Sequence, residues 1–152
     1  MSLIRFTLLH FLQFIICGVI GVYLRFSRID HSIDYLGVLS YGISEDSICN
    51  IEHILAGIGL PAVLMLLMMG VYIAILNLVE QVRKGNAMPL LAVLACTLYF
   101  ISAYEWEIQV VPHSNIGNQL FYDVLGLAIY ALIWTPFYGK NGGAITQKLK
   151  SL

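Results

Sequence analysis

The sequence predicts an all-α integral membrane protein whose single domain, residues 1–152, is a bundle of four transmembrane helices. Hydrophobic residues make up 59% of the chain and charged residues 11%, whereas globular proteins average about 45–50% and about 25%. The mean hydropathy of +0.83 agrees with this class. Formal charges are also missing from four long stretches, which are residues 6–24, 54–79, 87–104 and 124–138.

The uncharged stretches predict where the helices lie, because a helix needs about 20 apolar residues to cross the hydrocarbon core. The first stretch is interpreted as a retained helix, since it is too long for a signal peptide and no small-residue cleavage site follows it before Arg25. The transmembrane helices are therefore predicted at about residues 4–25, 52–80, 87–107 and 119–138.

Turn residues predict how the helices are joined. Gly85 suits a helix C-terminus, Asn86 suits an N-cap, and Pro89 is tolerated in the first turn of the next helix. The second and third helices are therefore predicted to form a tight antiparallel pair. The stretch 106–119 contains proline, serine, asparagine and glycine, which predicts a loop that makes the third and fourth helices neighbours.

The distribution of Lys and Arg predicts that both termini are cytoplasmic. With an inward N-terminus, six of the eight basic residues are cytoplasmic and only Arg25 and Arg28 lie outside. This orientation leaves an external segment at residues 26–51 and a cytoplasmic tail at residues 139–152. Residues 33–41 are too apolar for a solvated loop and too few to span, which predicts an interfacial helix or a plug over the bundle.

In this orientation eight of the nine acidic residues face outward, which indicates that the working side of the protein is external. Glu52 and His53 begin the second helix, where the helix dipole favours negative charge, so capping alone can explain Glu52. An interfacial histidine bonded to the backbone is the plainer interpretation of His53. Gly57 lies on the same helix face as His53 and permits another helix to approach closely.

Two glutamates end the third helix, and only one of them is expected to face the bundle, because residues two apart point in nearly opposite directions. Glu105 is the predicted inward residue, since Ser102 and Gln109 are polar neighbours on its face. Glu107 is predicted to face away. Negative charge is unfavourable at a helix C-terminus, which indicates that another group compensates Glu105.

Asp123 lies in the first turn of the fourth helix, with Gly126 and Tyr130 on its face. A carboxylate at the centre of a bilayer costs about 2.5–3.5 kcal/mol on insertion scales and less near the interface. A functional role would explain this residue. The helix dipole is the alternative explanation, because it stabilises a carboxylate at that position at small cost.

These residues form three short motifs, which are His53-Ile-Leu-Ala-Gly57, Glu105-Trp106 and Gln119-Leu-Phe-Tyr-Asp123 followed by Gly126. The motifs resemble those of the VanZ-like superfamily, particularly its YjdF-type branch. The resemblance implies a small multi-pass protein of the bacterial inner membrane with a role in the cell envelope, and it implies no established reaction. The chain departs from the pattern in having His113 where an Arg is usual between the last two motifs, and Gln119 where the branch often has Asp.

Two hypotheses from different classes follow. In the first, His53, Glu105 and Asp123 converge as a catalytic acid/base or metal site that binds or acts on an envelope lipid or lipid-linked precursor, because imidazole and carboxylates suit both roles. A divalent cation would then take its ligands from these three residues with Glu52 and His113. The residues expected to support the site are Gln109, Gln119, Gly57, Gly126 and Trp106.

In the second hypothesis the chain is a non-catalytic membrane subunit, and the same polar residues join helices to one another or to a protein partner. A proton-coupled carrier is a weaker third possibility, since His10, Gln13 and Asn77 are too few for a relay across the bilayer. Membrane lipids and other membrane proteins are the expected partners. Nucleic acid is not expected, because the formal net charge is −1 and no basic run is present.

Overall fold

A computed structural model describes residues 2–30, 37, 42–78, 86–110 and 116–151. This part of the chain contains helices and no strands, and its four α-helices are each long and apolar enough to cross a membrane. The predicted all-α class is therefore confirmed, and so are four helices with the length and composition that a membrane span requires. The elements are α1 Leu3–Ile29, α2 Glu45–Leu78, α3 Met88–Glu105, the π-helix η4 Trp106–Val110, and α4 Ile116–Leu149.

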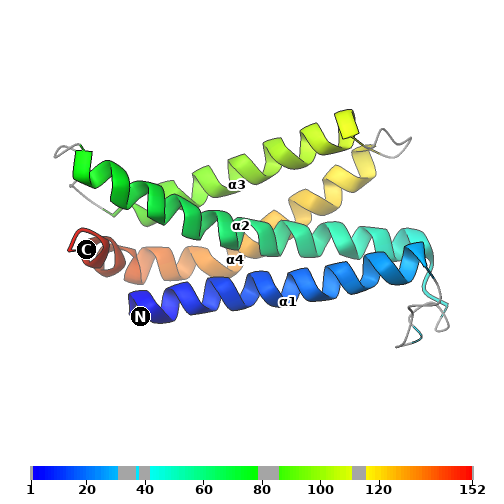
Figure 1. Ribbon diagram of the computed structural model, residues 1–152, viewed down its shortest axis with the longest axis horizontal. Coiled ribbons are helices and arrows are strands. Elements are labelled where there is room, and N and C mark those ends of the chain that lie inside the picture. The colour runs from blue at the N-terminus through cyan, green and yellow to red at the C-terminus, as the bar shows by residue number, and fades with distance from the viewer. Residues whose placement is uncertain (1, 31–36, 38–41, 79–85, 111–115, 152) are drawn as a thin grey trace.

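The helices lie side by side, with both chain termini at one end of the bundle (Figure 1). The opposite end, which we call the mouth, is formed by the end of α1 at Ile29, the start of α2 at Glu45, the end of α3 at Glu105 and the start of α4 at Ile116. α2 packs against the other three α-helices, and its longest interfaces are with α1 and α4. Groups from all four helices therefore approach one another at the mouth.

Several helices extend beyond their predicted bounds. α2 begins at Glu45 rather than near residue 52, because the Ser44 hydroxyl accepts a hydrogen bond from the Ser47 N–H at 3.2 Å and acidic side chains occupy the first turn. α4 continues through Pro136 to Leu149, so most of the expected tail is helical. The predicted interfacial segment at residues 33–41 falls almost wholly outside the described residues.

The apolar core lies in the half of the bundle near the termini. Its members come from the start of α1, the second half of α2, the first half of α3 and the part of α4 from Tyr130 onward, and they include Phe6, Met65, Met88 and Trp134. Large apolar side chains on the outer faces are exposed, as a surface in contact with lipid requires. The half near the mouth holds polar groups instead of a closed core.

A network of buried polar side chains, centred on His10, lies within this apolar core. His10 is fully buried, and its Nδ1–H donates to the Phe6 carbonyl at 3.1 Å, while Nε2 lies 3.3 Å from the Tyr138 hydroxyl. The Tyr130 and Tyr138 hydroxyls are 2.8 Å apart, and the His10 ring packs against Trp134 at a tilt of 32° with centroids 3.7 Å apart. Each buried polar group here has a partner, so the network joins α1 to α4.

Candidate functional site

α2 and α4 cross near the mouth at two glycines. A Cβ atom on Gly57 would lie 2.5 Å from the carbonyl oxygen of Asp123, and a Cβ atom on Gly126 would overlap the carbonyl oxygen of Ile54. No side chain fits at either position, so the two backbones touch. This contact brings His53, one turn before Gly57, against Asp123, which lies on the same face of α4 as Gly126.

Asp123 is the centre of the polar contacts at this crossing. The His53 Nδ1–H donates to Asp123 Oδ2 at 3.2 Å, and the Tyr99 hydroxyl donates to Asp123 Oδ1 at 2.5 Å. The Asp123 side chain is 2% exposed. One buried carboxylate therefore binds a group from α2 and a group from α3, which explains why it is stable at this depth.

The hydrogen bond to Asp123 determines which nitrogen of His53 is available. In a neutral imidazole whose Nδ1 carries the proton, Nε2 has a free lone pair. Within the described part of the chain, Nε2 has no hydrogen-bond partner. His53 is thus held by a carboxylate on one side and has an unused acceptor on the other.

His53, Tyr99 and Asp123 line a cavity of about 440 Å³ at the mouth, which we call the mouth cavity. Its walls combine the polar groups of all four helices with apolar surface from α2 and α3. The remaining lining residues are Arg25, Arg28, Cys49, Glu52, Ala56, Leu60, Ser102, Ala103, Trp106, Glu107 and Gln119.

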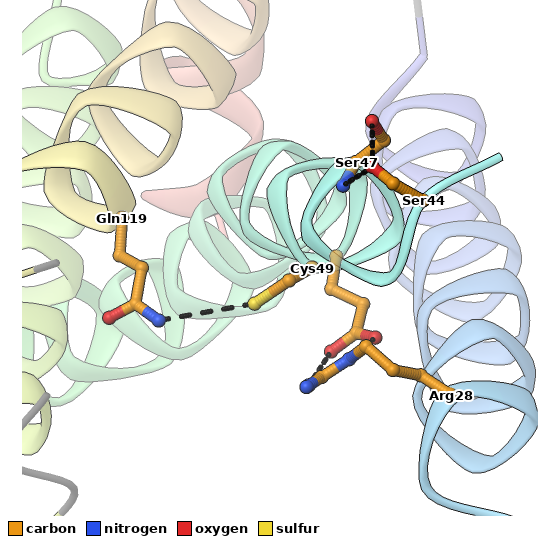
Figure 2. A network of polar contacts seen from close by, with 6 residues as sticks. Arg28, Ser44, Ser47, Cys49 and Gln119 are labelled. Carbon is orange, nitrogen blue, oxygen red and sulfur yellow. Dashed lines mark hydrogen bonds and ion pairs between the residues drawn. The ribbon is translucent and has the colours of Figure 1, made fainter.

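An ion pair forms the wall of the mouth cavity between α1 and α2. Arg28 donates to both carboxylate oxygens of Glu52, from Nε to Oε1 at 3.0 Å and from Nη2 to Oε2 at 3.1 Å. Figure 2 shows Arg28 on one side of α2 and Gln119 on the other, with Cys49 between them; Gln119 Nε2 lies 3.9 Å from Cys49 Sγ. Both Glu52 oxygens are therefore bound by Arg28, which leaves this predicted metal ligand occupied.

The predicted orientation of the two glutamates is wrong. Glu107 is the buried one, 5% exposed and lining the mouth cavity, whereas Glu105 is exposed and accepts a hydrogen bond from Gln109. Glu107 lies four residues after Ala103 and eight after Tyr99, which also line the mouth cavity, so helical spacing places it on their face. Of the predicted triad, the structure thus brings together His53 and Asp123 but not Glu105.

The other predicted residues have varied positions. Gln119 and Trp106 line the mouth cavity, and Gly57 and Gly126 form the helix crossing. Gln109 bonds Glu105 outside the cavity, and His113 is not among the described residues. No group of three or more His, Cys, Asp or Glu side chains suited to holding a metal ion occurs in the part of the chain that the structure describes.

Tyr99, Glu107 and Arg28 belong to the site but were not predicted to do so. A signal for Tyr99 was present, because Tyr99, Ser102 and Trp106 follow the three- and four-residue spacing of one helix face. The ion pair of Arg28 joins residues 24 apart in sequence, and no local pattern indicates such a contact.

The chain matches no protein-family model, no curated protein and no solved structure.

Proposed function

We propose that this chain is a multi-pass protein of a bacterial inner membrane, of VanZ-like type, whose mouth cavity binds an envelope lipid or lipid-linked precursor, with His53 as a general acid/base. The observation that carries the proposal is the hydrogen-bonded series His53, Asp123 and Tyr99 on the wall of a partly apolar cavity. Both termini are cytoplasmic in this proposal, and the mouth faces outward.

The arrangement of His53 suits proton transfer. A carboxylate that accepts from Nδ1–H fixes the tautomer and orientation of an imidazole, and it stabilises the imidazolium that forms when Nε2 takes a proton. His53 Nε2 would accept a proton from a hydroxyl group or a water molecule in the cavity. The deprotonated oxygen would attack an ester or phosphoester of the ligand, and as the bond to the leaving oxygen breaks, the same nitrogen would give that oxygen the proton. Asp123 and Tyr99 act as positioning residues in this scheme.

The mouth cavity also suits an amphiphilic ligand. Its volume of about 440 Å³ falls within the range of roughly 300–1,000 Å³ that is typical of ligand sites. Ala56, Leu60 and Ala103 supply apolar wall, while His53 and Glu107 supply polar groups. A ligand with a polar head and an apolar body would match both kinds of wall.

One observation favours the alternative, a non-catalytic membrane subunit. Asp123 joins α2, α3 and α4 through two hydrogen bonds, so these side chains also hold the bundle together. Interhelical hydrogen bonds of this kind contribute about 0.6 kcal/mol on average. Under the alternative, replacing His53 would change stability but no reaction.

The test uses purified full-length protein in nanodiscs prepared from a bacterial lipid extract that contains lipid-linked precursors. Wild type, His53→Gln and Glu105→Gln are incubated, and the lipids are analysed by mass spectrometry for conversion and for molecules that copurify. We expect wild type and Glu105→Gln to convert a lipid and His53→Gln to lose conversion, because Gln has no group that can take up the proton. The exposed Glu105 provides a matched polar control.

Conversion by His53→Gln at the wild-type rate would rule out His53 as an acid/base. An absence of conversion in all three proteins, with no lipid copurifying, would favour the membrane-subunit alternative.

A further inference from the structure

A second cavity of about 220 Å³ lies beside the mouth cavity along the α1–α2 interface, and we call it the α1–α2 groove. Arg25, Glu52, Ala56 and Leu60 line both spaces, so the two are adjacent. From Arg25 the lining of the groove follows α1 back to residue 14, a distance of about 16 Å at 1.5 Å per residue. The other lining residues are Phe14, Cys17, Gly18, Gly21, Val22, Leu55 and Gly59.

Glycines determine how closely α1 and α2 approach each other along the groove. At Gly59 the helices are in contact, because a Cβ atom there would lie 2.8 Å from Cys17 Cβ. One residue further along α1 the situation is different, since a Cβ atom on Gly18 would meet nothing within 4 Å. Apart from Arg25 and Glu52 at the end beside the mouth cavity, the groove offers no charged side chain to a ligand. It is thus an apolar slot that a larger residue at position 18 would fill.

Two hydrogen-bond acceptors in the mouth cavity are available to a ligand. Glu107 Oε2 and Gln119 Oε1 are buried acceptors without a partner in the described part of the chain. Both residues line the mouth cavity. Buried acceptors without partners are costly, so a ligand that supplies hydroxyl or ammonium donors would satisfy them.

Arg25 supplies the positive charge at the junction. It lines both spaces, and no ion pair of Arg25 occurs among the residues described. The neighbouring Arg28 is already neutralised by Glu52. An anionic group of a ligand would therefore bind at Arg25, between the apolar groove and the acceptors of the mouth cavity.

We propose that the two spaces together bind one glycerophospholipid. One hydrocarbon chain lies in the α1–α2 groove, the phosphate binds Arg25, and headgroup hydroxyls donate to Glu107 and Gln119. An apolar groove of this length suits a hydrocarbon chain, and its position beside the mouth cavity brings the headgroup of that lipid to the polar side chains there. The inference rests on the proposed lipid site, and it places the headgroup beside His53.

The experiment compares two lipids that share a phosphate and differ in headgroup hydroxyls and in net charge. Purified full-length protein is placed in nanodiscs of equal parts phosphatidylglycerol, whose headgroup has two hydroxyls, and phosphatidylcholine, whose headgroup has none. Lipid that stays bound after release into detergent is counted by native mass spectrometry. We expect wild type to retain phosphatidylglycerol about tenfold over phosphatidylcholine, as one or two charge-assisted hydrogen bonds would supply.

Two variants test the two ends of the site. Gly18→Leu fills the groove and should remove retention of both lipids, whereas Gly70→Leu, on α2 outside both cavities and equally open around its Cβ, should retain lipid as wild type does. Arg25→Gln should lower retention of both phospholipids about tenfold, because both contain the phosphate that it binds.

The outcomes separate this inference from the proposed function. Equal retention of the two lipids by wild type, or equal retention by Gly18→Leu and Gly70→Leu, would overturn the lipid layout even if His53-dependent conversion is observed. If the layout is correct and only the chemistry is wrong, His53→Gln and wild type will both retain phosphatidylglycerol and neither will convert it.

Discussion

Glu105 and Glu107 differ by two positions in the sequence and have opposite environments in the structure. Glu105 is exposed and bonded to Gln109, while Glu107 is buried on the wall of the mouth cavity with one oxygen that has no partner among the described residues. A buried carboxylate oxygen without a partner lowers stability, so Glu107 is a residue whose position is better explained by a ligand than by folding.

Replacing these two glutamates should therefore have different effects. We expect Glu107→Gln to raise the free energy of unfolding by about 1 kcal/mol, because an uncompensated buried charge is removed. We also expect it to weaken retention of phosphatidylglycerol, since a headgroup donor loses a charged acceptor. Thermal unfolding in detergent and native mass spectrometry measure the two effects.

Glu105→Gln is the matched control and should change neither quantity. A fall in stability of Glu107→Gln with unchanged lipid retention would mean that Glu107 is structural.

The local sequence predicts some of these contacts and not others. His53 lies four residues before Gly57, and Asp123 lies three residues before Gly126, each on the same helix face as its glycine. The close contact of the two glycines brings the two side chains together. The orientation of Glu107 was predicted wrongly, because Gln109 was interpreted as an inward neighbour of Glu105, whereas it bonds Glu105 outside the cavity. The cavity face of α3 instead continues from Ala103 to Glu107.

At the scale of the helices, the crossing of α2 and α4 determines the geometry of the candidate site. The two backbones touch at Gly57 and Gly126, with the carbonyl oxygens of Ile54 and Asp123 in the space where a Cβ would lie. Because these are backbone atoms, they can move only if the helices separate. The distance between His53 and Asp123 therefore depends on the absence of a side chain at two positions.

Gly126→Ala should consequently separate α2 from α4 and lengthen the His53–Asp123 contact. We expect a loss of about 1–3 kcal/mol in the free energy of unfolding, the usual cost of inserting a methyl group into a packed interface. The measurement is thermal or denaturant-induced unfolding of the purified protein in detergent.

Gly143→Ala, on the same helix with nothing within 4 Å of its Cβ, should be neutral or slightly stabilising, because alanine favours the helix. Equal stability of the two variants would contradict the tight crossing.

At the scale of the whole molecule, four spanning helices place both termini at one end of the bundle and the mouth at the other (Figure 1). The distribution of basic residues predicts that the end with the termini is cytoplasmic. Cysteine labelling tests this orientation in a background that lacks Cys17, Cys49 and Cys96. Single cysteines replace the exposed Ser2, Ser47 and Ser151.

We expect a membrane-impermeant maleimide to label Ser47→Cys in intact cells and to label Ser2→Cys and Ser151→Cys only after permeabilisation. The reverse pattern would place the mouth cavity on the cytoplasmic side and would exclude an outward-facing lipid site.

The sequence by itself determined the membrane class and the number of helices, because uninterrupted apolar length is a local property that the bilayer selects directly. It also indicated His53 and Asp123, since an ionisable residue near a glycine at a helix end can be recognised from the local sequence alone. Only the tertiary structure decided that Tyr99 binds Asp123, that Arg28 binds Glu52 and that Glu107 faces the cavity. Those contacts depend on how the helices are rotated about their axes, and rotation is set by packing between segments far apart in the chain.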